Sequence, residues 1–234
     1  MTAWWDYSLA DFLLFSPRVY YRLFENMNTT WGLVVASALL AGVIAFYLAL
    51  RHGLRGNRII PVLLALVWAW SGYGFLWQYY LPINWAVSYL LPGFVLQVVL
   101  FVIFAVRPLP LCFGWRGDFS SYVGLALVAF ALIVYPFIGL IEGRGLIQAE
   151  LFGSAADPTV LGTLGFVLLS RGTWRWVLLP VPLAWCVISA GTLWVMDQKV
   201  AVVMLVALWM TVFCGWLDFR NGVTRRRLET AEID

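Results

Sequence analysis

An acidic residue followed by proline and two spaced threonines marks the segment of this chain best suited to binding chemistry. In Asp157-Pro158-Thr159, proline suits the first turn of a helix, and an acidic residue just before it suits the helix N-terminus. Thr159 and Thr163 are one helical turn apart, so their hydroxyls share one face. Two interpretations stay open. Asp157 is a simple N-cap, or the free N–H groups and both hydroxyls bind a small polar solute or ion in a wet cavity.

Seven further polar residues are candidates to line or flank such a pocket. Three of them, next to the membrane surface, form either a salt-bridged rim or a relay. Gln97 is an amide in the middle of an apolar stretch, where an unpaired amide is costly, so we expect it to face other helices. Asn84 is expected to cap a helix or reach the pocket, and Tyr73 and Tyr135 are expected to supply hydroxyls. These candidates are Glu142, Arg144, Glu150, Gln97, Asn84, Tyr73 and Tyr135.

The residues that most often bind metals or cofactors are scarce and scattered. Cys112, Cys186 and Cys214 show no CxxC spacing, and His52 is the only histidine. We therefore expect no metal site and no cofactor. Because no catalytic triad, phosphate loop or dinucleotide motif is present either, we assign no catalytic residues and regard an enzyme as the weakest interpretation.

The composition places these residues in a membrane. The 234 residues are 63% hydrophobic and 12% charged, and they include fourteen tryptophans. A soluble core of this size does not absorb so much apolar surface. The net charge of +3 is too small to indicate a nucleic-acid partner, so the expected partner is the lipid bilayer.

Seven apolar stretches are expected to form a helical bundle. Residues 158–170 reach only about 20 Å as a helix, against a hydrocarbon core of about 30 Å. We therefore expect the segment before them to dip in from one face, turn at Asp157-Pro158 and leave as a short helix, because lipid-exposed coil is excluded at that depth. The fold class is thus all-α integral membrane, with one re-entrant segment. The stretches are 31–50, 59–79, 86–106, 120–141, 158–170, 177–196 and 200–217.

The first thirty residues are expected to lie at the membrane interface. Ser8 and Asp11 resemble a capping box for a short helix ending near Phe15, and Ser16-Pro17 starts a second helix. The second helix is amphipathic and is expected to lie in the membrane plane. Its predicted apolar face consists of Val19, Tyr20, Leu23, Phe24 and Met27. The predicted division is an interfacial segment at 1–30, a transmembrane domain at 31–218 and a polar cytoplasmic tail at 219–234.

The basic residues predict the orientation. Eleven of the fifteen Lys and Arg residues fall in alternate connections, near residues 51–58, 107–116, 171–175 and 220–227. Positively charged connections stay on the cytoplasmic side. We therefore predict seven crossings, with the N-terminus outside and the C-terminus in the cytoplasm.

Several local strings resemble those of a known type of protein. They are VWAWSG (67–72), PINWA (82–86), FVLQ (94–97), YPFIGLIEG (135–143) and FGSAADPTVLGTLG (152–165). Together they resemble an uncharacterised bacterial family of multi-pass membrane proteins, a domain of unknown function sometimes labelled permease. The resemblance implies the bacterial inner membrane. It also implies Cys-Pro-Thr-Thr where this chain has Asp157-Pro158-Thr159-Val160, and histidine in place of Arg144, so that possible metal ligands are missing here.

Three functions follow from these observations. The first is a small-solute or ion transporter with an outer-side pocket lined by Asp157, Thr159, Thr163, Asn84 and Gln97. The second is an accessory subunit of a larger membrane complex, with other subunits or further copies of the chain as partners. The third is an intramembrane enzyme acting on a lipid or quinone.

Overall fold

The protein is helical apart from one very short β-ladder. The computed structural model describes residues 15–51, 53, 56–107 and 111–231. In these residues β1 (Cys112–Phe113) pairs antiparallel with β2 (Ser170–Arg171). The α-helices are α1 (Pro17–Thr30), α2 (Gly32–Leu50), α3 (Gly56–Trp70), α4 (Leu91–Val106), α5 (Phe119–Ala129), α6 (Tyr135–Ile141), α7 (Ala156–Leu169), α8 (Pro180–Val195) and α9 (Ala201–Ala231).

Shorter helical segments join them. Two are π-helical: η3 (Ser71–Tyr80) extends α3, and η5 (Phe130–Val134) joins α5 to α6. Three are 3₁₀ turns: η4 (Trp85–Tyr89), η6 (Leu146–Gln148) and η7 (Thr173–Leu178). The hydrogen-bond ladder returns from π to α at Tyr135, next to Pro136.

Six helices in the described part of the chain are long and apolar enough to cross a membrane. They are Gly32–Leu50, Gly56–Tyr80, Trp85–Val106, Phe119–Ile141, Trp174–Val195 and Ala201–Asn221. The architecture agrees with an all-α, multi-pass membrane protein. The α7 helix is apolar but shorter.

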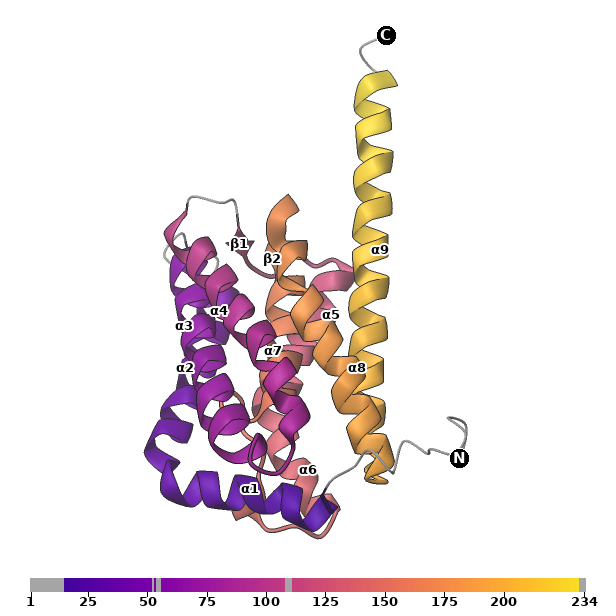
Figure 1. The fold of residues 1–234 in the computed structure, drawn as a ribbon. Coiled ribbons are helices and arrows are strands. Elements are labelled where there is room, and N and C mark those ends of the chain that lie inside the picture. Colours follow the sequence, from indigo (N-terminus) through magenta and orange to yellow (C-terminus); the bar gives the residue numbers. More distant parts are fainter. Residues whose placement is uncertain (1–14, 52, 54–55, 108–110, 232–234) are drawn as a thin grey trace.

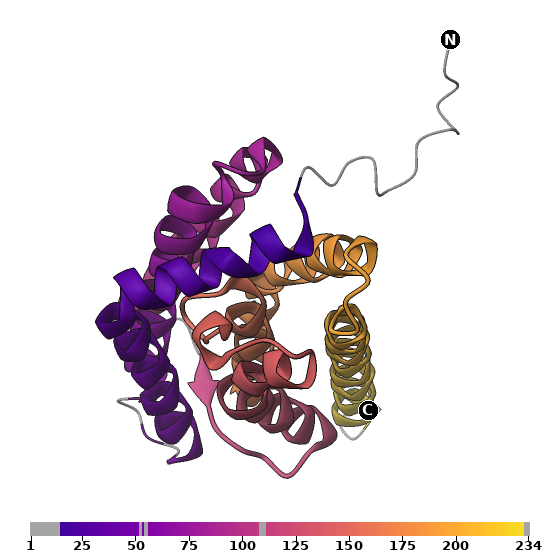
Figure 2. The same ribbon diagram turned by 90° about the horizontal axis from the view of Figure 1, so that it is seen from below.

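The long helices stand side by side, and the two ends of the bundle differ (Figure 1). At one end α1 lies across the other helices, as the view from below shows (Figure 2). At the other end are β1, β2 and the C-terminal part of α9. We call these the α1 end and the strand end.

The start of α1 is as predicted, but its apolar face meets protein. The Ser16 side chain caps the helix by accepting a hydrogen bond from the Val19 amide at 3.4 Å. Phe24 is fully buried and stacks on Phe75 of η3, with ring centroids 4.8 Å apart. Val19, predicted to lie on the apolar face, is instead exposed, and Tyr21 is buried. This face packs against the bundle, so α1 is more than a lipid anchor.

Other predictions for the chain ends are not settled by the structure. The predicted capping box at residues 8–11 lies outside the described residues. At the other end, α9 runs unbroken across the predicted boundary at residue 218. The division into 1–30, 31–218 and 219–234 stays a prediction.

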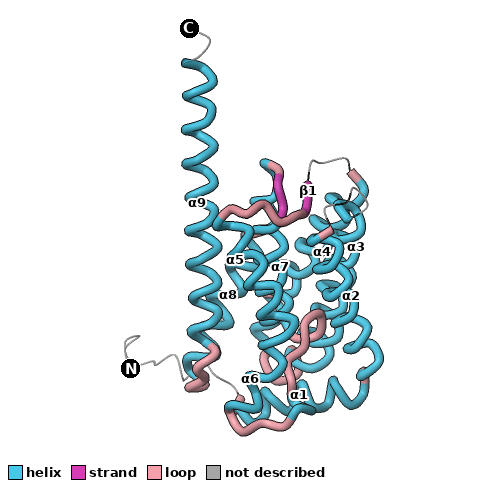
Figure 3. Tube along the Cα trace, turned by 180° about the vertical axis from the view of Figure 1, so that it is seen from behind, coloured by secondary structure: helices cyan, strands magenta, loops and turns pink. Residues whose placement is uncertain are grey.

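The centre of the bundle is α7, in which every residue is buried. Gly165 lets it approach α5 closely, because a Cβ there would lie 2.6 Å from the Gly124 carbonyl oxygen. The loop before α7 rises from the α1 end into the bundle (Figure 3). In this loop Gly153 has φ of +81°, and an added Cβ would lie 2.8 Å from the Ala38 Cβ, so only glycine fits. The loop and α7 therefore carry the candidate residues into the protein interior.

Candidate functional site

Asp157 is a buried carboxylate held by three side chains from two other helices. Its Oδ1 accepts hydrogen bonds from Trp185 Nε1 and Ser189 Oγ, both at 2.7 Å. Its Oδ2 accepts one from Tyr135 Oη at 3.3 Å. All three donors are neutral, so the charge of an ionised Asp157 is solvated by dipoles rather than by a cation.

The interpretation of Asp157 as a simple N-cap is wrong. Ala155 occupies the N-cap position of α7 and makes no side-chain cap hydrogen bond. Asp157 lies one residue inside the helix, where an acidic group still benefits from the helix dipole. Its side chain meets α8 instead of the first amides of its own helix.

The two threonines have structural partners. Thr159 Oγ1 accepts a hydrogen bond from the Gly153 amide at 2.8 Å and donates one to the Ala155 carbonyl at 2.6 Å. Thr163 Oγ1 accepts one from Trp68 Nε1 at 2.8 Å and donates one to the Thr159 carbonyl at 2.8 Å. Both hydroxyls therefore fasten the loop and α3 to α7, and neither joins Asp157 in one pocket.

A cavity of about 390 Å³ adjoins Asp157 at the α1 end. Two donors to Asp157, Trp185 and Ser189, form part of its wall, so Asp157 lies directly behind them. We call it the α1-end cavity. It is lined by Tyr20 of α1, Tyr80 and Asn84, Ala86, Tyr89 and Leu90 around η4, and Trp185, Ile188, Ser189, Thr192 and Leu193 of α8.

The residues that line the α1-end cavity differ in their exposure to solvent. Tyr20, Tyr80 and Trp185 are each only 5% exposed, whereas Tyr89 is 75% exposed. The cavity thus has a buried aromatic interior and an exposed rim. Aromatic rings with a few hydroxyls and an amide are typical of small-molecule sites.

Three other predicted residues lie in different places. Asn84 lines the α1-end cavity and also caps η4, because its Oδ1 accepts a hydrogen bond from the Ala86 amide at 3.1 Å. Gln97 is buried as predicted, but it donates to the Leu178 carbonyl at 3.2 Å, outside the cavity. Tyr73 is exposed and accepts a hydrogen bond from Gln78.

The three residues expected to form either a salt-bridged rim or a relay make ion pairs with one another. Arg144 lies 2.6 Å from Glu142 and 3.3 Å from Glu150, measured between nitrogen and oxygen. Its guanidinium also lies over the Tyr21 ring, 3.5 Å from the centroid. Burial, reinforced by the charge of Asp157, raises the pKa of Glu150 to about 8. The cluster ties the 142–150 loop to α1.

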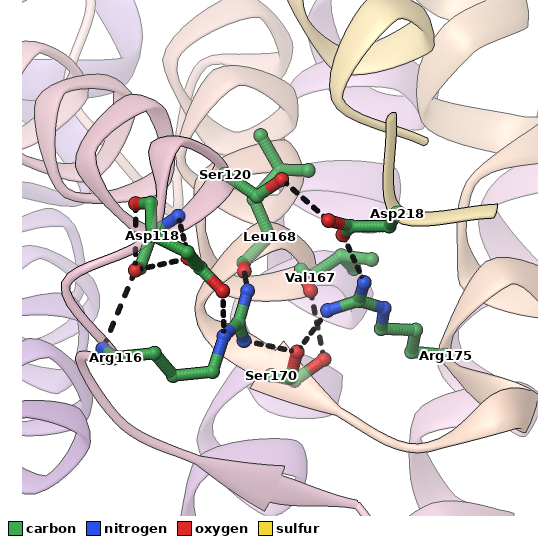
Figure 4. Close-up of polar contacts among 9 residues, drawn as sticks. Arg116, Asp118, Ser120, Val167, Leu168, Ser170, Arg175 and Asp218 are labelled. Atoms are coloured by element: carbon green, nitrogen blue, oxygen red, sulfur yellow. Dashed lines mark hydrogen bonds and ion pairs between the residues drawn. The ribbon is translucent and has the colours of Figure 1, made fainter. Parts of the chain in front are cut away.

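A second polar network closes the opposite end of α7 (Figure 4). Arg116 donates to the carbonyls of Ser170 at 2.8 Å and Leu168 at 3.1 Å, and its Nε lies 2.6 Å from Asp118. Burial opposes ionisation of Asp118, but hydrogen bonds from Arg116 and Ser121 lower its pKa to about 2. An arginine at these carbonyls satisfies the open C-terminus of α7.

Arg175 completes the strand-end network. It donates to the Ser170 carbonyl and pairs with Asp218 of α9, and Asp218 also accepts a hydrogen bond from Ser120 at 3.0 Å. Because both arginines and both aspartates have partners in the fold, we interpret this network as structural. It fixes α5, α7 and α9 at one end. The α1-end cavity is the candidate binding site because residues that line it bond to Asp157.

Several residues of the site were not predicted from the sequence: Tyr20, Tyr80, Trp185, Ser189 and Thr192. One signal was available, because Trp185 and Ser189 are four residues apart and share a helix face. The tyrosines gave no such signal, because aromatic residues are abundant throughout the chain.

Comparison with known proteins gives a family and no activity. No curated protein and no solved structure matches this chain. A family model described as a family of unknown function, DUF6064, matches residues 17–224, which include α1, α7 and every residue that lines the α1-end cavity. The chain therefore belongs to the DUF6064 family.

Proposed function

We propose that this protein is a permease for a small cationic solute, which it binds in the α1-end cavity. One observation carries the proposal: a buried carboxylate with only neutral donors lies directly behind an aromatic cavity. A buried anion attracts a cation that enters the cavity, since the interior screens charge less than water does.

The walls of the cavity suit a cation as well. Tyr20, Tyr80 and Trp185 present aromatic rings, whose faces attract ammonium groups. Ser189, Thr192 and Asn84 add hydroxyl and amide groups that bind the polar part of a solute. A small organic amine or quaternary ammonium compound meets both conditions.

The arrangement of the chain supports a proposed topology. The C-terminal ends of α2 and α4, the segment from β1 to α5, β2, η7 and the C-terminal part of α9 lie at the strand end. These described segments include Arg51, Arg107, Arg116, Arg171, Arg175 and Arg220. We propose that this end faces the cytoplasm of a bacterial inner membrane, with the α1 end outside. In this topology the 142–155 loop is re-entrant, and α7 completes a seventh crossing.

Choline and its neutral isostere 3,3-dimethyl-1-butanol test the proposal, because they differ by one charge at nearly equal size. Choline at about one hundred times its Kd stabilises the purified protein by about 2.7 kcal/mol, which thermal unfolding in detergent measures. The isostere gives no comparable shift, because it lacks the charge. Equal shifts for both compounds would contradict a cation site.

A matched pair of substitutions locates the site. Thr192→Phe fills the α1-end cavity, whereas Val187→Phe adds the same ring to an exposed position of α8. We expect choline binding and choline uptake into liposomes to be lost only in Thr192→Phe. Uptake that is unchanged in this variant would place the transport path elsewhere.

The same experiments also test the two alternative functions, an accessory subunit and an enzyme. An accessory subunit would co-purify with a second polypeptide at fixed stoichiometry and take up no solute alone. An enzyme would convert a lipid or quinone in the absence of any partner. No specific contact among the described residues favours either alternative.

A further inference from the structure

A second acidic side chain near the α1 end has an oxygen without a partner. Glu150 is 5% exposed, and its Oε2 is buried with no hydrogen-bond partner among the described residues. Its other oxygen accepts a hydrogen bond from Arg144 at 3.3 Å, while Arg144 is closer to Glu142, at 2.6 Å. Glu150 thus shares the guanidinium of Arg144 with Glu142.

This geometry favours the protonated acid. An ionised carboxylate needs donors for both oxygens, and a buried oxygen without one costs several kcal/mol. Protonation removes the charge and so most of that cost.

The groups around Glu150 connect it to the cavity. Arg144 bonds to Glu150 and lies over the ring of Tyr21, and Tyr21 contacts Tyr20 edge to face with ring centroids 5.3 Å apart. The other titratable groups within electrostatic range of Glu150 are Glu142, Tyr135 and Asp157. Tyr20 also lines the α1-end cavity. Burial raises the pKa of Tyr20, and the charges of Asp157 and Glu150 raise it further, so both carboxyl groups lie within electrostatic range of this cavity residue.

We propose that Glu150 binds a proton that is exchanged for the cation in the α1-end cavity. When the cation enters, its positive charge stabilises the ionised form of Glu150, and the proton leaves to water at the α1 end past the partly exposed Glu142. One positive charge enters and one leaves, so the charge of the site is unchanged. This inference rests on the proposed function, since it identifies the ion coupled to transport.

Infrared spectroscopy of the purified protein tests the proton site without any solute. We expect the carbonyl absorption of a protonated carboxylic acid to disappear as the pH rises through about 8, and to be absent in Glu150→Gln. Glu25→Gln is the control and keeps the band, because Glu25 of α1 bonds to Gln148 and not to Arg144. Carbon-13 labelling of glutamate assigns the band in the wild-type protein, so the test does not depend on the folding of a variant. A wild-type protein with no glutamic acid band at neutral pH would overturn the proposal.

The pH dependence of choline binding tests the exchange. Release of one proton predicts that the affinity of the wild-type protein rises about tenfold per pH unit below the pKa of Glu150, and that the affinity of Glu150→Gln does not change with pH. Binding that is independent of pH in the wild-type protein would overturn the exchange but not the cation site. Absence of choline binding would overturn the proposed function, and the exchange with it, whatever the infrared band shows.

Discussion

Replacement of Glu150 by glutamine should remove most of the pH dependence of stability near neutral pH. Burial raises the pKa of Glu150 from 4.5 to about 8 in the folded protein. The folded state therefore holds one more proton than the unfolded state between these values. The stabilisation from this proton is complete below about pH 4.5 and is lost as the pH rises through about 8.

The size of the effect follows from the two pKa values. Each pH unit in this window changes the free energy of unfolding by about 1.36 kcal/mol. Between about pH 6 and pH 8 the wild-type protein should lose about 2 kcal/mol, and the slope should flatten as Glu150 becomes ionised. Glu150→Gln keeps a neutral side chain of similar size, so its stability should change little over the same range.

Unfolding by sodium dodecyl sulfate in mixed micelles, followed by tryptophan fluorescence, measures this difference. The fourteen tryptophans give a strong signal. Glu25→Gln, which leaves the ion pairs of Arg144 intact, is the control and should keep the wild-type slope. If the wild-type stability is flat from about pH 6 to pH 8, or if Glu150→Gln keeps the slope, then Glu150 is not a buried acid with a raised pKa and the reasoning fails.

The same unfolding assay tests the packing and the two polar networks. Gly165→Ala forces a Cβ to 2.6 Å from a carbonyl oxygen and should destabilise the protein by about 1 to 3 kcal/mol or more. Gly191→Ala, whose Cβ would meet no atom within 4 Å, should be neutral or slightly stabilising. Equal effects of the two substitutions would refute the close approach of α7 to α5. Thr163→Val leaves the Trp68 indole without its acceptor and should cost about 1 to 3 kcal/mol, with choline binding retained; lost binding in a folded variant would return Thr163 to the binding site. Asp218→Asn weakens the strand-end network and should cost about 1.5 to 3 kcal/mol with uptake preserved, and unchanged stability would show that the network is not structural.

The sequence predicts best what depends on local rules. The Ser16-Pro17 helix start is confirmed, because capping involves neighbouring residues. The burial of Gln97 is also confirmed, since it follows from the properties of one amide in an apolar stretch. The helical class and the approximate helix bounds were also predictable, because both follow from the length of each apolar stretch.

Local rules could not predict the hydrogen-bond partners of Asp157. Trp185 and Ser189 are 28 and 32 residues away in the sequence, and their meeting depends on how α7 and α8 pack. The hydrogen bonds of the threonines follow a local rule, because a hydroxyl inside a helix readily donates to the carbonyl four residues earlier. Thr159 and Thr163 both do so, and neither lines the α1-end cavity.

Native mass spectrometry of the protein extracted from its own membranes tests the central claim most directly. The wild-type protein, Val187→Phe and Thr192→Phe are compared in the same mild detergent. We predict a small cationic adduct on the wild-type protein and on Val187→Phe, and none on Thr192→Phe. The same adduct on all three proteins, or a second polypeptide at fixed stoichiometry with no adduct, would contradict a solute site in the α1-end cavity.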